Sequence, residues 1–169
     1  MRRLQSDKFS DVYSVRLLDE TDIPMISALC RGNTQFYSYC GQPFSEETIR
    51  SDLYITPPGK GLEDKYYTGF FCDEQLCAVM DLIDGYPDDT TAFIGFFMLD
   101  KEIQGEGRGS AMITELCAYL KRMGCARVQL GIDKDNPQST HFWKKNGFLS
   151  VREIVRPEGT IILAQRMLR

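Results

Sequence analysis

A glycine-rich stretch, Gln104-Gly105-Glu106-Gly107-Arg108-Gly109-Ser110, has the composition of a loop that binds a phosphate group. Glycines at alternate positions let backbone N–H groups approach a ligand without interference from a Cβ atom. The apolar run at residues 92–99 predicts a buried strand before the loop, and the apolar stripe within residues 110–123 predicts a helix after it. The first turn of a helix adds unpaired N–H donors and the positive end of the helix dipole. The sequence therefore predicts a strand, an anion-binding turn and a helix, in that order.

Three known glycine motifs differ in the spacing that they require. A nucleoside-triphosphate P-loop has Lys-Ser or Lys-Thr after its last glycine, and Gly109-Ser110-Ala111 lacks the lysine. A dinucleotide fingerprint has a third glycine where this chain has Ser110, although a small residue is sometimes tolerated there. The third motif, Gln or Arg followed by x-x-Gly-x-Gly or Ala, is met by Gln104, Gly107 and Gly109.

At this motif the sequence resembles the GCN5-related N-acetyltransferase (GNAT) family, whose members bind the pyrophosphate of acetyl-CoA with that loop. A second motif of the family follows downstream. An alternating strand over residues 127–132 leads to Asn136 and then to a helix that ends in Phe142-Trp143-Lys144-Lys145-Asn146-Gly147-Phe148. The two motifs stand in the order and at the spacing of the family, so the resemblance is strong.

The resemblance implies an α+β fold, with a mixed sheet of about seven strands and about four flanking helices. The sheet would be splayed between its fourth strand, residues 90–99, and its fifth, residues 127–132, and the acetyl-CoA arm would enter that splay. The order of the predicted elements also favours a mixed sheet, because strands gather at both ends of the chain and do not alternate regularly with helices. We expect residues 1–169 to form one domain.

Local signals predict the other elements. Capping residues predict helices over residues 22–32 and 45–53. The aromatic residues Phe36, Tyr37 and Tyr39 fall between these helices, in a predicted loop. Alternating or apolar runs predict strands at residues 12–18, 66–72, 76–83, 150–155 and 160–167.

The resemblance also implies roles for residues of the two motifs. The loop from Gln104 to Ser110 would hold the pyrophosphate, and a backbone N–H near Met98 and Leu99 would polarise the thioester carbonyl. Phe97 would lie along the pantetheine beside them. The second motif would complete the cofactor site with Asn136, Phe142 and Trp143.

Transfer of an acetyl group to an amine requires that the amine lose its proton. An alkyl amine of pKa ~10.4 costs roughly 4.6 kcal/mol to deprotonate at pH 7, so a carboxylate or a water chain that takes the proton would raise the rate. The nearest candidates, Asp81 and Asp84, fall on opposite faces of a regular strand, so only one faces the substrate unless the strand bulges. Both also fit surface carboxylates near a turn. Tyr37, Tyr39 and Tyr86 are further candidates, as acids or as walls of the acceptor pocket.

One position departs from the family. Members often have a tyrosine four residues before the glycine of the terminal Gly-Phe, where it protonates the departing thiolate, and this chain has Trp143 there. An indole N–H donates hydrogen bonds but does not readily release its proton, so water or another loop must supply it. Trp143 also fits a role in packing its helix against the sheet. For His141, on the same helix, we expect a solvated or hydrogen-bonded structural role.

We interpret the chain as an acetyl-CoA-dependent N-acetyltransferase, an acyltransferase that acts on a small-molecule or peptidyl primary amine by direct attack in a ternary complex. Loops at residues 30–65 and 84–90 should form the acceptor pocket. A CoA-binding module without catalysis is an alternative, because the usual tyrosine acid and an obvious base are both missing. A dinucleotide-binding domain is a weaker alternative.

Composition limits the kinds of partner that the sequence predicts. The 169-residue chain has a formal net charge of −4, which argues against nucleic acid, because phosphates demand a basic face. It contains no run of about 18 apolar residues, so we expect no membrane partner. Its six cysteines form no C-x-x-C pair and it has one histidine, so we expect buried, reduced thiols in a cytoplasmic protein and no metal. A homodimer is left open.

Overall fold

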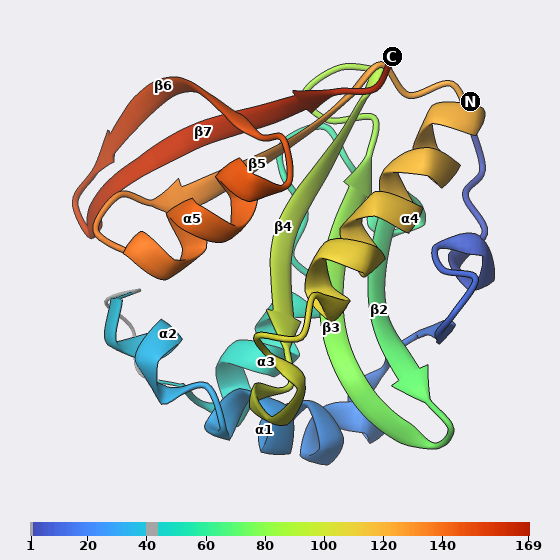
Figure 1. The fold of residues 1–169 in the computed structure, drawn as a ribbon, viewed down its shortest axis with the longest axis vertical. Coiled ribbons are helices and arrows are strands. Elements are labelled where there is room, and N and C mark those ends of the chain that lie inside the picture. The colour runs from blue at the N-terminus through green and yellow to red at the C-terminus, as the bar shows by residue number, and fades with distance from the viewer. Residues whose placement is uncertain (1, 40–43) are drawn as a thin grey trace.

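The computed structural model describes residues 2–39 and 44–169, and the seven strands among them form one sheet (Figure 1). The order across the sheet is β1-β2-β3-β4-β5-β7-β6, and β4 and β5 are its one parallel pair of neighbours in the described part. The mixed sheet predicted from the sequence is therefore confirmed. The strands are β1 (Ser14–Leu17), β2 (Lys65–Cys72), β3 (Gln75–Asp84), β4 (Thr91–Leu99), β5 (Arg127–Asp133), β6 (Leu149–Arg156) and β7 (Gly159–Met167).

The helices begin and end largely where the capping signals predict. Ser45 accepts a hydrogen bond from the Thr48 backbone N–H at 3.1 Å and so caps the helix that starts at the next residue. Gly32 follows the last residue of the first helix. The α-helices in the described residues are α1 (Ile23–Arg31), α2 (Thr34–Tyr39), α3 (Glu46–Asp52), α4 (Arg108–Arg122) and α5 (Pro137–Lys145).

Helix α2 corrects one prediction. Phe36, Tyr37 and Tyr39 lie in this helix and not in a loop. Six residues are too few to show a helical stripe, and no side chain of α2 is fully buried. Ring contacts hold the helix instead, because Phe36 packs edge-on against Tyr37 at 5.2 Å and against Phe96 of β4 at 6.1 Å.

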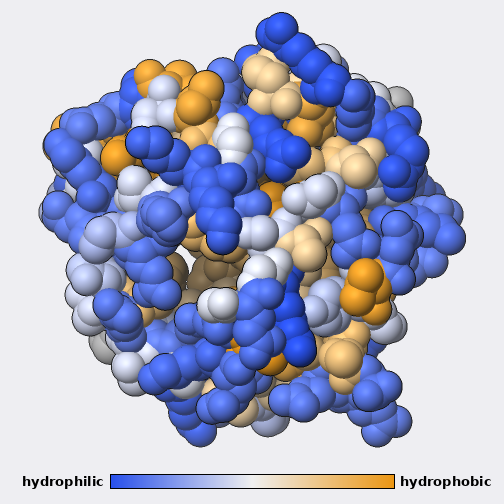
Figure 2. Space-filling model, viewed as in Figure 1, coloured by the Kyte–Doolittle hydropathy of each residue, from blue (hydrophilic) through white to orange (hydrophobic). Residues whose placement is uncertain are grey.

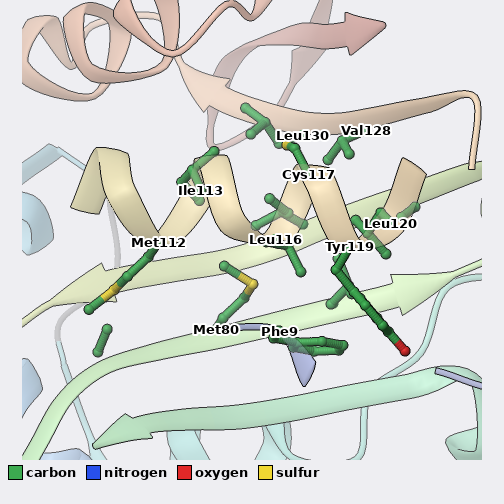
Figure 3. Packing of buried hydrophobic residues seen from close by; sticks show 14 of the residues in the cluster. Phe9, Met80, Met112, Ile113, Leu116, Cys117, Tyr119, Leu120, Val128 and Leu130 are labelled. Atoms are coloured by element: carbon green, nitrogen blue, oxygen red, sulfur yellow. The ribbon is translucent and has the colours of Figure 1, made fainter. Parts of the chain in front are cut away.

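Two apolar layers fix the position of the sheet. Helix α4 lies across β2, β3 and β4 on one face (Figure 1). Its Met112, Leu116 and Leu120 belong to the same buried cluster as Met80 of β3, and Leu116 lies next to Met80 (Figure 3). These side chains are fully buried, and each such burial stabilises the fold by about 1.5–3 kcal/mol. Helices α1 and α3 cover the opposite face over a second cluster that includes Val79. The packing of α4 holds its first turn at the end of β4.

The sheet opens between β4 and β5. Their pairing runs from Thr91 with Arg127 to Ile94 with Leu130 and then stops. At that point Gly95 bulges out of the β3–β4 ladder, because Asp81 pairs with Phe96 and the next residue of β3 pairs with Ile94. Beyond the bulge, β4 is paired on its β3 side alone. The splay between the fourth and fifth strands is therefore present where the resemblance implied it.

The cysteines follow the prediction with one exception. Cys30, Cys77, Cys117 and Cys125 are buried and free of disulfides. Cys72 is a free thiol but is exposed, because it ends β2 beside the turn into β3, so the prediction that it is buried is wrong. Cys40 lies outside the described residues. No helix in the described part of the chain is both long and apolar enough to cross a membrane.

Candidate active site

A pocket of about 380 Å³ occupies the place where β4 has separated from β5. Figure 2 shows it as a hollow between the positions that α5, α2 and β4 have in Figure 1. Its walls come from the end of β4, the glycine-rich loop, the start of α2 and one side of α5. Of the predicted cofactor residues, those that line it are Phe97, Met98, Leu99, Gln104, Gly105, Gly107, Gly109, Ser110, Asn136, Phe142 and Trp143.

The N-terminus of α4 opens into this pocket without a side-chain cap. Gly107 is the N-cap residue, with φ of 79°, and the first intrahelical bond runs from the Ala111 N–H to its carbonyl. The N–H groups of residues 108–110 therefore have no acceptor within the helix. Gly105 has φ of 81°, and a Cβ built on either glycine would meet no atom within 4 Å. The loop thus presents bare donors and a positive helix end to an anion.

The loop is tied to β4 by side chains rather than by packing alone. Gln104 donates from Nε2 to the Leu99 carbonyl at 3.0 Å and to Asn33 Oδ1 at 2.7 Å. Asn33 donates from Nδ2 to the same Leu99 carbonyl and to the carbonyl of Leu29 in α1. The predicted loop residue Gln104 therefore acts as a brace. Asn33 was not predicted, because the two partners that link it to the loop and to β4 lie 71 and 66 residues away and leave no local signal.

Backbone direction decides which groups of β4 face the pocket. The Asp100 N–H donates to the Cys77 carbonyl at 2.8 Å, and hydrogen-bonded positions alternate along an antiparallel ladder. The backbone groups of Met98 therefore point toward β3. The backbone groups of Phe97 and Leu99 point away from β3, toward the side on which β5 no longer pairs with β4. Of the two residues predicted near the thioester carbonyl, Leu99 is the one whose N–H faces the pocket.

Helix α5 forms the opposite wall. Asn136 caps it, since its Oδ1 accepts from the Ser139 N–H at 3.1 Å. At the other end, Asn146 donates from Nδ2 to the Ser110 hydroxyl at 3.1 Å and to the Phe142 carbonyl at 2.8 Å, which ties α5 to the first turn of α4. His141 is exposed at the rim of the pocket.

Trp143 is both a core residue and a wall of the pocket. It is 7% exposed and packs edge-on against Phe142 at 4.9 Å and Phe148 at 5.1 Å. Phe97 of β4 lies 5.9 Å from it. The indole therefore joins α5 to the sheet while one part of it stays open to the pocket.

Other predicted site residues lie elsewhere. Glu106 and Arg108 pair with each other at 3.1 Å on the surface and do not line the pocket. Asp84 is bound to Arg2 at 2.6 Å, on the face of the sheet that α4 covers. Tyr86 packs on Phe93 at 5.6 Å. Asp81, Asp84, Tyr86 and Tyr39 line neither of the two pockets described here.

Asp81 leaves β3 on the face opposite to Asp84 and forms a buried ion pair. Its Oδ2 accepts from Lys65 Nζ at 2.8 Å, while its Oδ1 has no hydrogen-bond partner. Lys65 also donates to the carbonyl of Ile55 at 2.8 Å. Burial raises the pKa of the Asp81 carboxyl, and the hydrogen bond from Lys65 opposes that shift.

A second pocket of about 190 Å³ lies on this same face, beneath α3. Residues 45, 48, 49 and 52 form one side of it, at helical spacing along α3. Tyr37, one of the predicted acceptor tyrosines, lines it. Asp52, which falls within the predicted acceptor loop at residues 30–65, and Tyr67 also line it, but neither was predicted individually, since neither belongs to a motif. Phe36 lines both pockets, so the two are neighbours.

Several known structures with the same fold are acetyltransferases. An acetyltransferase from Thermus thermophilus superposes with a TM-score of 0.75 and 19% identity, over 99% of this chain and 100% of its own. The Salmonella typhimurium acetyltransferase that modifies the N-terminal serine of ribosomal protein L7/L12 gives 0.72 and 20%, over 95% and 98%. PaiA N-acetyltransferase from Thermoplasma acidophilum, in complex with coenzyme A, gives 0.64 and 17%, over 92% and 98%.

Sequence comparison assigns the family. None of the curated protein sequences matches the chain. The model of the acetyltransferase (GNAT) family matches residues 33–148, from the brace residue Asn33 to the end of the second motif. Because this match spans more than half of the chain, the protein belongs to the GNAT family and is an N-acetyltransferase.

Proposed function

We propose that the protein transfers an acetyl group from acetyl-CoA to a primary amine by direct attack in a ternary complex. One observation carries this proposal: the uncapped N-terminus of α4 and the unpaired edge of β4 open into the same pocket. The bare N–H groups of residues 108–110 suit a pyrophosphate, and the glycines leave room for it. Acetyl-CoA, when bound there, supplies the activated acyl group.

The chain contributes orientation and hydrogen bonds. The N–H of Leu99 points into the pocket, where it can stabilise negative charge on a carbonyl oxygen. The brace formed by Gln104 and Asn33 fixes the Leu99 carbonyl and therefore the direction of the peptide beside it. A donor held in place in this way needs no reorganisation during the reaction.

For proton transfer, the relevant face of the sheet is the one that carries the second pocket. Of the two predicted bases, Asp81 lies on the same face of the sheet as the second pocket, lines neither pocket, and has one oxygen without a partner. Asp84 lies on the other face and its carboxylate is engaged by Arg2, so we assign it no role in the reaction. The leaving thiol has a pKa of about 8.5, so water can protonate it at neutral pH and a tyrosine at position 143 is not required.

Coenzyme A should stabilise the protein. At a concentration 100-fold above its dissociation constant the gain is about 2.7 kcal/mol, which raises the melting temperature by roughly 5–10 °C for a chain of this size. Thermal melts with CoA, NAD and ATP measure this directly. A shift with NAD or ATP but none with CoA would contradict the proposal. CoA binding without thiol release across a panel of amines would instead favour a binding module without catalysis.

Substitution of Trp143 separates packing from chemistry. Trp143→Phe keeps an aromatic ring between Phe142 and Phe148, so we expect it to retain CoA affinity and most of the turnover. Trp143→Ala should lower the free energy of unfolding by about 3–5 kcal/mol, through the cavity that it leaves, and should weaken CoA binding as well. Steady-state kinetics and melting temperatures of both variants test this. A stable Trp143→Phe protein that binds CoA normally but has no turnover would show that the indole N–H takes part in the reaction.

A further inference from the structure

The second pocket combines aromatic walls with a single charge. Its rings are those of Phe36, Tyr37, Phe44, Tyr67 and Phe96. Burial raises the pKa of the Tyr67 phenol, so that group stays neutral. Among the described residues that line the pocket, Asp52 is the one charged side chain.

The charge of Asp52 is not balanced within the described residues. Nearby, Lys65 and Asp81 form an ion pair with each other at 2.8 Å, so together they carry no net charge. The Asp52 carboxylate makes no hydrogen bond or ion pair with another described residue. It is also the last residue of α3, where the negative end of the helix dipole disfavours an anion. Burial raises the pKa of its carboxyl, Asp81 raises it further and Lys65 opposes the shift. A cation in the pocket would relieve each of these unfavourable effects.

The position of the pocket places its occupant next to the reacting groups. Phe96 lines it and Phe97, the following residue of β4, lines the larger pocket from the other face. The reacting amine must lie near the Leu99 N–H at the end of β4, in the larger pocket. The second pocket therefore suits another part of the acceptor. At about 190 Å³ it is smaller than the roughly 300 Å³ or more of pockets for whole ligands, so it suits one short arm.

We propose that this pocket, with Asp52 at its charged end, binds a second cationic group of the acceptor. The acceptor is then an amine that carries another positive charge at the end of a short apolar linker. Aromatic faces attract such a cation and the linker packs against the rings, while the carboxylate supplies the counter-charge. A free diamine and a peptide with a basic residue beside its N-terminus share this chemistry. The inference rests on the proposed function, because it concerns the acceptor of that reaction.

The test compares 1,5-diaminopentane with n-pentylamine, which lacks the second charge. The wild-type enzyme should prefer the diamine in kcat/KM by at least about tenfold, as a charge-assisted hydrogen bond would give. In Asp52→Asn the ratio of the two kcat/KM values should fall by about the same factor. Glu47→Gln removes a charge from the exposed side of the same helix and should leave the ratio unchanged. An equal loss for both amines in Asp52→Asn would overturn the inference, because Asp52 would then act on the reacting amine.

Calorimetry gives a measurement that does not depend on turnover. The CoA-loaded wild-type protein should bind the diamine, and CoA-loaded Asp52→Asn should bind it at least about tenfold more weakly. If no amine releases thiol, the proposed reaction fails, and the diamine titration alone decides the inference. If thiol is released with both amines at equal kcat/KM in the wild type, the inference fails and the reaction stands. Two peptides that differ in lysine or norleucine at their second residue distinguish a peptidyl source of the cation from a free diamine.

Discussion

Gly107→Val should abolish most of the affinity for CoA while the protein stays folded. Gly107 has φ of 79°, in the left-handed region, where a β-branched residue is strained by at least about 1–2 kcal/mol. Its side chain would stand over the bare N–H groups at the start of α4. Loss of two charge-assisted hydrogen bonds of about 1.5 kcal/mol each corresponds to roughly a hundredfold weaker binding. Calorimetric titration with CoA, together with a urea melt, measures both effects.

Gly124→Val is the matched control for that experiment. Gly124 also has positive φ, at 93°, and a Cβ there would also meet no atom within 4 Å. It follows the C-terminal end of α4 and does not line the pocket. The control should lose a similar amount of stability and keep its CoA affinity. Unchanged CoA affinity in folded Gly107→Val would mean that the loop is a turn and nothing more.

Lys65→Met should lower the free energy of unfolding by about 3–5 kcal/mol at pH 7. The substitution leaves the buried Asp81 carboxylate without its counter-ion, and Asp81 Oδ1 already has no partner. Burial raises the pKa of Asp81, so the folded state holds its proton more tightly than the unfolded state does. The free energy of unfolding of Lys65→Met should therefore fall as the pH rises from about 4, the ordinary pKa of aspartate, toward neutrality. Urea denaturation across that range measures the loss.

Two further variants test whether the loss of stability depends on the burial of the ion pair. Lys134 and Glu153 form an ion pair of the same 2.8 Å length at the surface, so Lys134→Met should cost less than about 1 kcal/mol. The double variant Lys65→Met with Asp81→Leu replaces the buried pair by apolar groups of similar shape, so we expect it to regain most of the lost stability. A double variant as unstable as Lys65→Met would contradict the argument. Thiol release by a folded double variant also tests Asp81 as the base, since a true base could not be lost without effect.

Local signals predicted the elements that form much of the larger pocket's wall. The glycine loop, the strand before it and the helix after it are contiguous, and each is governed by periodicity or by backbone freedom within a few residues. The family resemblance singled out Asn136 as a cofactor contact, and in the structure it caps α5. Knowledge of the family supplied the splay of the sheet, which no local pattern contains.

Local signals could not predict the second pocket in this way. Asp52, Tyr67 and Phe96 come from α3, β2 and β4, and they meet only because the sheet brings those elements together. Helix α2 was missed because ring contacts to a distant strand decide its conformation. The buried ion pair of Asp81 could not be inferred either, because its partner Lys65 lies 16 residues away, at the start of another strand.

The bulge at Gly95 reverses the faces of the sheet to which the even- and odd-numbered side chains of β4 point. Before it, Ala92 and Ile94, at even positions, belong to the layer under α4. After it, Phe97, at an odd position, packs on that layer, and Phe96 turns to the layer under α1 and α3. A Cβ on Gly95 would lie 3.1 Å from Asp81 Oδ2, so the chain has little room for another residue type at this point. One unpaired residue thus decides which of two adjacent phenylalanines lines the larger pocket and which lines the second pocket. Adding or removing one residue in this strand would exchange the walls of the two pockets.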